Sequence, residues 1–190
     1  MGGRNIIGIV GMPGSGKSVF DGVAKELGFS IIIMGDIVRE EAVRRGLEPT
    51  PENIGRVMIK IREEDGPAVV AKRCIPKIRE VKTKGVIIDG IRSLVEVEEF
   101  KRSFPEFKVV HIHSSPEIRF QRISNRRRSD DPKSWEVFAE RDHQELGVGI
   151  GSAIAMADHV IINERTLPQF KTKVKKFLKA ILDEQCNHKY

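Results

Sequence analysis

One eight-residue segment near the start of the chain constrains the fold more than any other feature. Residues 11 to 18 read Gly-Met-Pro-Gly-Ser-Gly-Lys-Ser, and they directly follow the apolar run Ile6 to Val10. This is the G-x-x-x-x-G-K-[ST] pattern between a strand and a helix, which is the context of a phosphate-binding loop. An ordinary glycine-rich turn is the alternative, and eight residues of the right types in the right context disfavour it.

Each residue type in this loop has a physical role. Glycine permits the backbone conformations that turn the N–H groups of residues 14 to 17 inward around a phosphate. The lysine then reaches the β- and γ-phosphates, the following serine offers its hydroxyl to Mg²⁺, and the helix adds its positive end. We therefore predict that the chain binds ATP with Mg²⁺ through Gly11, Gly14, Ser15, Gly16, Lys17 and Ser18.

Composition limits the remaining possibilities. A chain of 190 residues, 39% hydrophobic and 32% charged, suits one α/β domain over residues 1–190 with a single core. The net charge of +6 is compatible with nucleic acid, but the arginines of a nucleotide site already account for it. Cys74 and Cys186 are far apart, which favours a reduced, cytoplasmic protein. No apolar stretch approaches the ~20 residues of a membrane helix.

Five short apolar runs recur along the chain, and each is nearly continuous, as a parallel strand buried on both faces should be. Helical patterns lie between them. This alternation predicts a doubly wound, five-stranded parallel sheet, with ligands at the carboxyl ends of the strands. The predicted strands are Ile6–Val10, Ser30–Ile33, Gly85–Asp89, Lys108–His113 and His159–Ile162.

Two segments are longer than a simple crossover requires. Residues 35–83 place three helical patterns between the second and third strands, and residues 126–157 combine an arginine-rich stretch with a long helical region. Two such inserts beside a phosphate loop suit a clamp for a second substrate and a lid. The predicted helices are Ser18–Leu27, Asp36–Arg45, Pro51–Glu64, Pro67–Val81, Ser93–Ser103, Ser115–Arg127 and one through Leu167–Ile181.

Charged residues follow the second and third predicted strands. Asp89 closes the apolar run of the third strand, where a carboxylate can hold the water shell of Mg²⁺ beside Ser18. Asp36 and Arg39 follow the second strand, and Arg92 follows the third. Two arginines at adjacent strand ends can bind a second phosphate in forked geometry. A surface pair and a loop arginine are the alternative.

An arginine run extends from Arg119 to Arg128 at the end of a predicted helix. Arg122 and Arg126 are four residues apart and therefore share one helix face. Crowded arginines repel one another, and a bound polyphosphate would neutralise them. A nucleic-acid-binding face is the alternative, although no interleaved aromatic residues support it.

These motifs together resemble the P-loop nucleoside monophosphate kinases. The loop has the form found in adenylate kinases, and Gly-Asp-Ile-Val-Arg at 35–39 resembles their Gly-Asp-x-x-Arg, whose arginine contacts the acceptor phosphate. The segment 121–131 is similar to the two sides of the adenylate kinase lid. The resemblance implies that Arg122 packs on the donor adenine and that Arg126 and Arg128 act on the phosphates.

The C-terminal part is similar to another group. Ala-Asp-His-Val-Ile-Ile-Asn at 157–163 resembles dephospho-coenzyme A kinases, in which the residue matching Asp36 activates the acceptor hydroxyl. The whole chain looks most like an archaeal adenylate-kinase-related family without an assigned substrate. It differs from adenylate kinases in two respects. Asp-Gly-Ile-Arg at 89–92 places Arg92 one residue earlier than the arginine of those enzymes, and the lid is short.

The predicted function is transfer of the γ-phosphoryl group of ATP to a small phosphorylated acceptor, such as a nucleoside monophosphate or dephospho-coenzyme A. Lys17 and the lid arginines neutralise the transferring group, while Asp36, Arg39 and Arg92 hold the acceptor. A P-loop NTPase or nucleotide-driven switch and an RNA-linked binding module remain alternatives. A Ras-type GTPase is disfavoured because no asparagine here is followed by lysine. The acceptor and the oligomeric state are left open.

Overall fold

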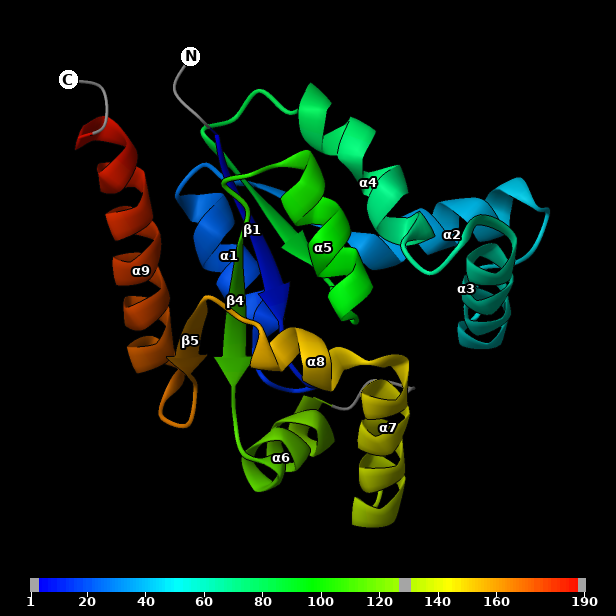
Figure 1. Ribbon diagram of the computed structural model, residues 1–190. Helices are drawn as coiled ribbons and strands as arrows, with labels where there is room; N and C mark the ends of the chain where they lie inside the picture. Colours follow the sequence, from blue (N-terminus) through cyan, green and yellow to red (C-terminus); the bar gives the residue numbers. More distant parts are fainter. Residues whose placement is uncertain (1–3, 127–130, 188–190) are drawn as a thin grey trace.

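The computed structural model describes residues 4–126 and 131–187, with side chains described as far as Asp183. Arg128, which the sequence assigns to catalysis, lies outside the described residues. Within them, one sheet of five parallel strands runs through the molecule in the order β2-β3-β1-β4-β5 (Figure 1). The strands are β1 (Asn5–Val10), β2 (Ser30–Ile33), β3 (Gly85–Asp89), β4 (Lys108–His113) and β5 (His159–Ile162).

Helices cover both faces of this sheet, and successive strand residues alternate between the faces. In β1, Ile7 and Ile9 point toward α1 and α9, whereas Ile6 and Val10 point toward the other layer. The doubly wound α/β fold predicted from the sequence is confirmed. The helices are α1 (Lys17–Glu26), α2 (Met34–Arg44), α3 (Pro51–Asp65), α4 (Val69–Glu80), α5 (Leu94–Ser103), α6 (Pro116–Arg126), α7 (Trp135–Val148), α8 (Ile150–Ala155) and α9 (Leu167–Asn187).

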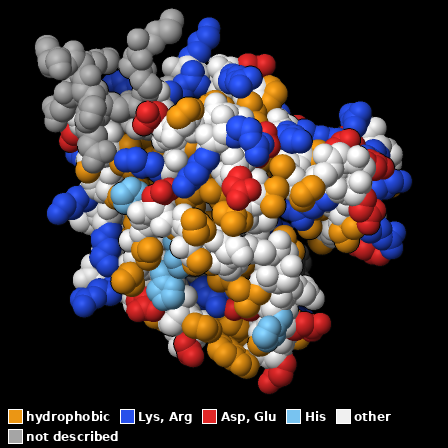
Figure 2. Space-filling model, in the orientation of Figure 1, with side chains coloured by type: hydrophobic (Ala, Val, Ile, Leu, Met, Phe, Trp, Pro, Cys, Tyr) orange, Lys and Arg blue, Asp and Glu red, His pale blue; other side chains and the backbone are white. Residues whose placement is uncertain are grey.

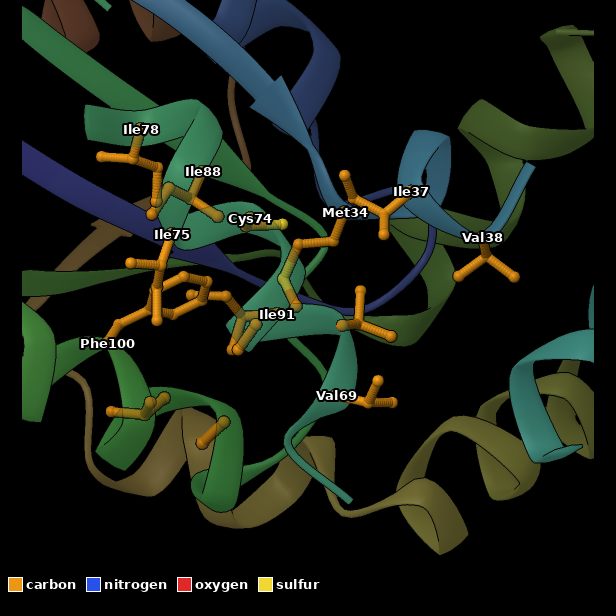
Figure 3. Close-up of a cluster of buried hydrophobic side chains, with 14 of the residues drawn as sticks. Met34, Ile37, Val38, Val69, Cys74, Ile75, Ile78, Ile88, Ile91 and Phe100 are labelled. Atoms are coloured by element: carbon orange, nitrogen blue, oxygen red, sulfur yellow. The ribbon is translucent and has the colours of Figure 1, made fainter. Parts of the chain in front are cut away.

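The predicted elements agree closely with the observed ones. The last four strands have the predicted bounds, and β1 begins one residue earlier at Asn5. The ends of α1 to α6 differ from the predicted ones by at most two residues, whereas α9 continues six residues beyond the predicted Ile181 to Asn187. The larger core cluster joins strand residues to α2, α4, α5 and α8, with Ile88 and Phe100 fully buried at its centre (Figure 3). This cluster attaches the first insert to the sheet.

The three helices of that insert project from one side of the sheet (Figure 1). Glu41 is buried between them and accepts hydrogen bonds from the guanidinium groups of Arg44 (Nε, 2.9 Å), Arg45 (Nε, 2.6 Å) and Arg73 (Nη1, 2.9 Å). A buried carboxylate of this kind is tolerated only when it is paired. Figure 2 shows acidic and basic side chains interspersed on the exposed face of the insert.

The second insert divides into two parts. Helix α7 lies beside α6, whereas α8 packs against α5, with Ile150 and Ala153 buried in the larger core cluster. The C-terminal part of the predicted lid region, from residue 150 onward, is therefore part of the packed body. None of the helices in residues 4–126 and 131–187 is long and apolar enough to cross a membrane.

Candidate active site

The phosphate loop joins the end of β1 to the start of α1. Gly14 and Gly16 have φ angles of 81° and 108°, in the left-handed region that favours glycine. Gly16 also has no room for a side chain, because a Cβ atom there would lie 2.4 Å from Nδ2 of Asn163. The loop is closed by the Ser15 N–H, which donates to the carbonyl of Met12 at 3.1 Å.

The Lys17 side chain folds back over this loop. Its Nζ donates to the carbonyl of Gly11 at 2.6 Å, and burial lowers the pKa of its ammonium group below the ordinary value. The charges of Asp89 and Glu145 act in the opposite direction and favour the charged form. Ser18 lies exposed on the first turn of α1. Lysine and serine are thus placed at the helix start, as the motif predicts.

Asp89 lies at the end of β3, and it has a second carboxyl group beside it. Asp21, on the second turn of α1, is buried and forms a side-chain hydrogen bond with Asp89. Burial and the charge of Asp89 raise the pKa of Asp21 to about 7. In neither residue does Oδ1 accept a hydrogen bond from an N–H or hydroxyl group of the described residues. These acceptor oxygens suit a hard cation, as the magnesium assignment of Ser18 and Asp89 requires.

A buried arginine links the loop to the second insert. Arg119 of α6 is 3% exposed, and its Nη1 donates to the carbonyl of Pro13 at 3.2 Å and to Oδ1 of Asp142 at 2.8 Å. Its guanidinium group also lies 4.9 Å from the ring centre of Phe138. Arg119 and Asp142 therefore attach α7 to the phosphate loop. Neither the sequence motifs nor helical periodicity predicted this attachment.

Arg122 lies one turn further along α6, on the side of the loop toward β5. Its Nη1 donates to Oγ of Ser114 at 2.9 Å, and its Nη2 donates to the carbonyl of Asn163 at 2.9 Å. The Asn163 side chain in turn donates to the carbonyl of Ser15 at 2.8 Å. Arg122 is thus tied to the loop through Asn163, which follows β5, and its predicted role at the donor site stays a prediction.

Internal partners relieve the crowding of the arginine run. Arg119 pairs with Asp142, and Arg126 pairs with Asp131 on the far side of residues 127–130. The expectation that a bound polyphosphate is needed to neutralise these arginines is therefore wrong for these two. The reason is that Asp142 is distant in sequence and Asp131 lies beyond the end of α6, so helix spacing alone shows neither pairing.

The predicted acceptor residues lie at the neighbouring strand ends. Ile33 at the end of β2 is the register partner of Asp89, and a Cβ atom on Gly90 would lie 3.6 Å from Cβ of Met34. The start of α2, the helix that carries Arg39, is therefore adjacent to the loop that carries Arg92. Asp36 and Arg39 form an ion pair with side chains 51% and 53% exposed.

Arg92 faces two acidic groups. Its backbone N–H donates to Oε2 of Glu96 at 2.8 Å, and its Nε lies 3.6 Å from Oε2 of Glu145 on α7. Glu96 is buried and also accepts from Arg62 of α3 at 3.0 Å. Sequence reasoning missed Glu145, although its spacing of three residues from Asp142 places both on one helix face.

A family model described as an AAA domain matches residues 10–139, which include the phosphate loop, Arg39, Arg92 and the arginine run. Curated archaeal relatives match almost the whole chain. A UPF0200 protein of Thermococcus sibiricus is 51% identical over 180 residues, covering 93% of this chain and 95% of the relative. The chain belongs to the UPF0200 family. A second member, from Hyperthermus butylicus, is 47% identical over 178 residues, covering 94% and 95% of the two chains.

Solved structures of two kinases share this fold. A gluconokinase from Sinorhizobium meliloti has a TM-score of 0.60 at 14% identity, and it covers 100% of this chain and 98% of its own. A shikimate kinase from Acinetobacter baumannii, solved with shikimate, has a TM-score of 0.59 at 17% identity, covering 95% and 94%. At these identities the likeness shows the fold, and the family name states no substrate.

Proposed function

We propose that this UPF0200 protein transfers the γ-phosphoryl group of ATP to a small acceptor that carries an anionic group. The observation that carries the proposal is that cationic residues suited to a donor and to an acceptor follow neighbouring strands of the sheet. Lys17 lies in the phosphate loop after β1, and Arg39 and Arg92 follow β2 and β3. A donor and an acceptor bound there would meet beside Asp89.

Catalysis in such a site rests on positioning and charge neutralisation, because the transition state of phosphoryl transfer is loose. Lys17 and the loop amides would hold the β- and γ-phosphates. Arg122 would lie against the donor nucleotide, and Arg126 would approach the phosphates; the catalytic role predicted for Arg128 lies outside the described residues. Of the lid region predicted over residues 126–157, the lid role of the part before α8 stays a prediction.

Magnesium fits the residues present. Ser18 would supply a hydroxyl oxygen, and Asp89 a carboxylate whose Oδ1 has no donor among the described residues. The bound ion would neutralise charge on the β- and γ-phosphate oxygens. Asp21 would orient Asp89 through the hydrogen bond between their side chains.

A P-loop NTPase is the second candidate. The half-exposed Asp36 and Arg39 side chains support it, because an open acceptor side admits water as the acceptor. Nucleic acid binding has less support, since the insert surface in Figure 2 carries both charges side by side.

The test is the release of ADP from MgATP in the presence of a panel of acceptors. Nucleoside monophosphates and dephospho-coenzyme A follow from the sequence motifs, and gluconate and shikimate follow from the structural neighbours. One acceptor should raise ADP release above the water background and should itself gain a phosphoryl group by mass spectrometry. The Lys17→Ala variant is the control. Steady release that no acceptor raises would favour the NTPase, and no release at all would refute both.

A further inference from the structure

Glu145 lies beside Arg92 and near enough to Lys17 to act on its charge. Its carboxylate is 14% exposed, and its Oε2 lies 3.6 Å from Nε of Arg92. It also lies close enough to Lys17 to favour the charged form of that ammonium group. No motif predicted a carboxylate at this position, where the transferring group and the acceptor are expected to meet.

The helix that carries Glu145 is held at two points, near its middle and at its C-terminal end. Near the middle, Asp142 pairs with Arg119, which also donates to the carbonyl of Pro13 in the phosphate loop. At the C-terminal end, α7 stops at Gly149, where a Cβ atom would lie 3.8 Å from the carbonyl oxygen of Arg92. The helix therefore spans from the donor loop to the acceptor loop, and Glu145 lies between its two attachments.

The Glu145 carboxylate can still accept a hydrogen bond or a proton, although Arg92 lies beside it. A separation of 3.6 Å from Arg92 is longer than a hydrogen bond, so the lone pairs of Oε2 stay available to a third group. A carboxylate repels the phosphates that the two cations would bind, unless it receives a proton or a hydrogen bond during the reaction. Asp36, by contrast, is paired with Arg39 and half-exposed.

We propose that Glu145 is the general base of this site and that the acceptor reacts through a hydroxyl group. This inference rests on the proposed phosphotransferase function and narrows its substrate class. The acceptor O–H bond breaks and its proton passes to the Glu145 carboxylate. The acceptor oxygen forms a bond to the γ-phosphorus, and the bond from that phosphorus to the β,γ-bridging oxygen breaks, with its electron pair leaving on ADP. Arg92 holds an anionic group of the acceptor, and Asp36 orients it.

The test compares Glu145→Gln and Glu145→Ala with Glu140→Gln, an exposed glutamate one turn earlier on the same helix. ADP release is compared between two classes of acceptor. The hydroxyl acceptors are gluconate, shikimate and dephospho-coenzyme A, and the others are nucleoside monophosphates, whose phosphate oxygen needs no base. Glu145→Gln should lower kcat for the hydroxyl acceptor by roughly 10²–10⁴-fold. Glu140→Gln should match wild type. Affinity for a non-hydrolysable ATP analogue, measured by calorimetry, should be unchanged in Glu140→Gln and should not fall in the two Glu145 variants, because they lose a carboxylate that repels phosphate.

Chemical rescue separates a proton acceptor from a structural residue. Formate should restore part of the lost kcat to Glu145→Ala, because a small carboxylate can enter the vacated space and accept the proton. A kcat for Glu145→Gln equal to that of wild type would overturn the inference and leave Glu145 as a support for Arg92. Turnover confined to nucleoside monophosphates would overturn it as well.

The two proposals fail in different ways. Wild-type protein that releases no ADP under any condition refutes the phosphotransferase, and the inference with it. An active wild type with an equally active Glu145→Gln refutes only the inference. Turnover of water alone, abolished in Glu145→Gln, would keep the base but refute the hydroxyl compound as acceptor.

Discussion

Replacing Asp21 by asparagine should change the pH dependence of stability. Asp21 is 8% exposed on α1 and shares a hydrogen bond with Asp89, and its pKa is raised from 3.8 to about 7. Burial is the main cause, and the charge of Asp89 adds to it. Lys25 and Lys17 act in the opposite direction. Asparagine keeps the size of the side chain and can donate to Asp89, but it cannot ionise.

The sign follows from the number of protons bound. Between pH 3.8 and about 7, the folded protein keeps the Asp21 proton while the unfolded chain has lost it. The contribution of Asp21 is therefore fully present below pH 3.8 and is lost as the pH rises through about 7. At about 1.4 kcal/mol per pH unit, the loss between pH 5 and 8 is at most about 3 kcal/mol. The two carboxyl groups titrate as a pair, so the shared proton is counted once.

Urea denaturation of wild type, Asp21→Asn and Asp183→Asn at pH 5 and pH 8 checks this, with EDTA present to exclude metal. Asp183 lies exposed on α9 and controls for the loss of one charge. The free energy of unfolding of Asp21→Asn, relative to wild type, should rise by about 1 to 3 kcal/mol from pH 5 to pH 8. A difference that is the same at both pH values would refute the reasoning.

Four other outcomes are expected. Lys17→Ala should lower ADP release by roughly 10²–10⁴-fold with an unchanged circular dichroism spectrum, and full turnover would end the phosphate-loop assignment. Asp142→Ala should reduce the free energy of unfolding, measured in urea, by about 3 kcal/mol, because it leaves the buried Arg119 guanidinium without its carboxylate. A loss below about 0.5 kcal/mol would show that the backbone carbonyls alone are enough to stabilise the buried guanidinium group. Arg39→Ala should raise the KM of the acceptor while calorimetry finds the same ATP affinity, and the reverse pattern would move Arg39 to the donor side. Single-stranded RNA should not bind without ATP in fluorescence anisotropy at physiological salt; tight binding with a log–log salt slope of roughly −0.7 per phosphate contacted would favour the nucleic-acid alternative.

The sequence by itself determined the fold class, nearly all strand bounds and the phosphate loop. These features depend on local patterns. A parallel strand buried on both faces requires a continuous apolar run, and Gly14 and Gly16 are required by backbone conformations that few other residues adopt. Lys17 and Ser18 follow the loop directly, so their place at the helix start was predictable from spacing.

Only the tertiary structure decided which side chains meet. The strand order places β3 beside β1 and so brings Asp89 to Asp21, a residue that no sequence motif singled out. The approach of Glu145 to Arg92 depends on how α7 is held between two distant loops. Periodicity identifies the apolar face of a helix but not the surface that the face covers. For the same reason α8, predicted as part of a lid, belongs to the core: which apolar surface it covers is set by the packing of the whole chain.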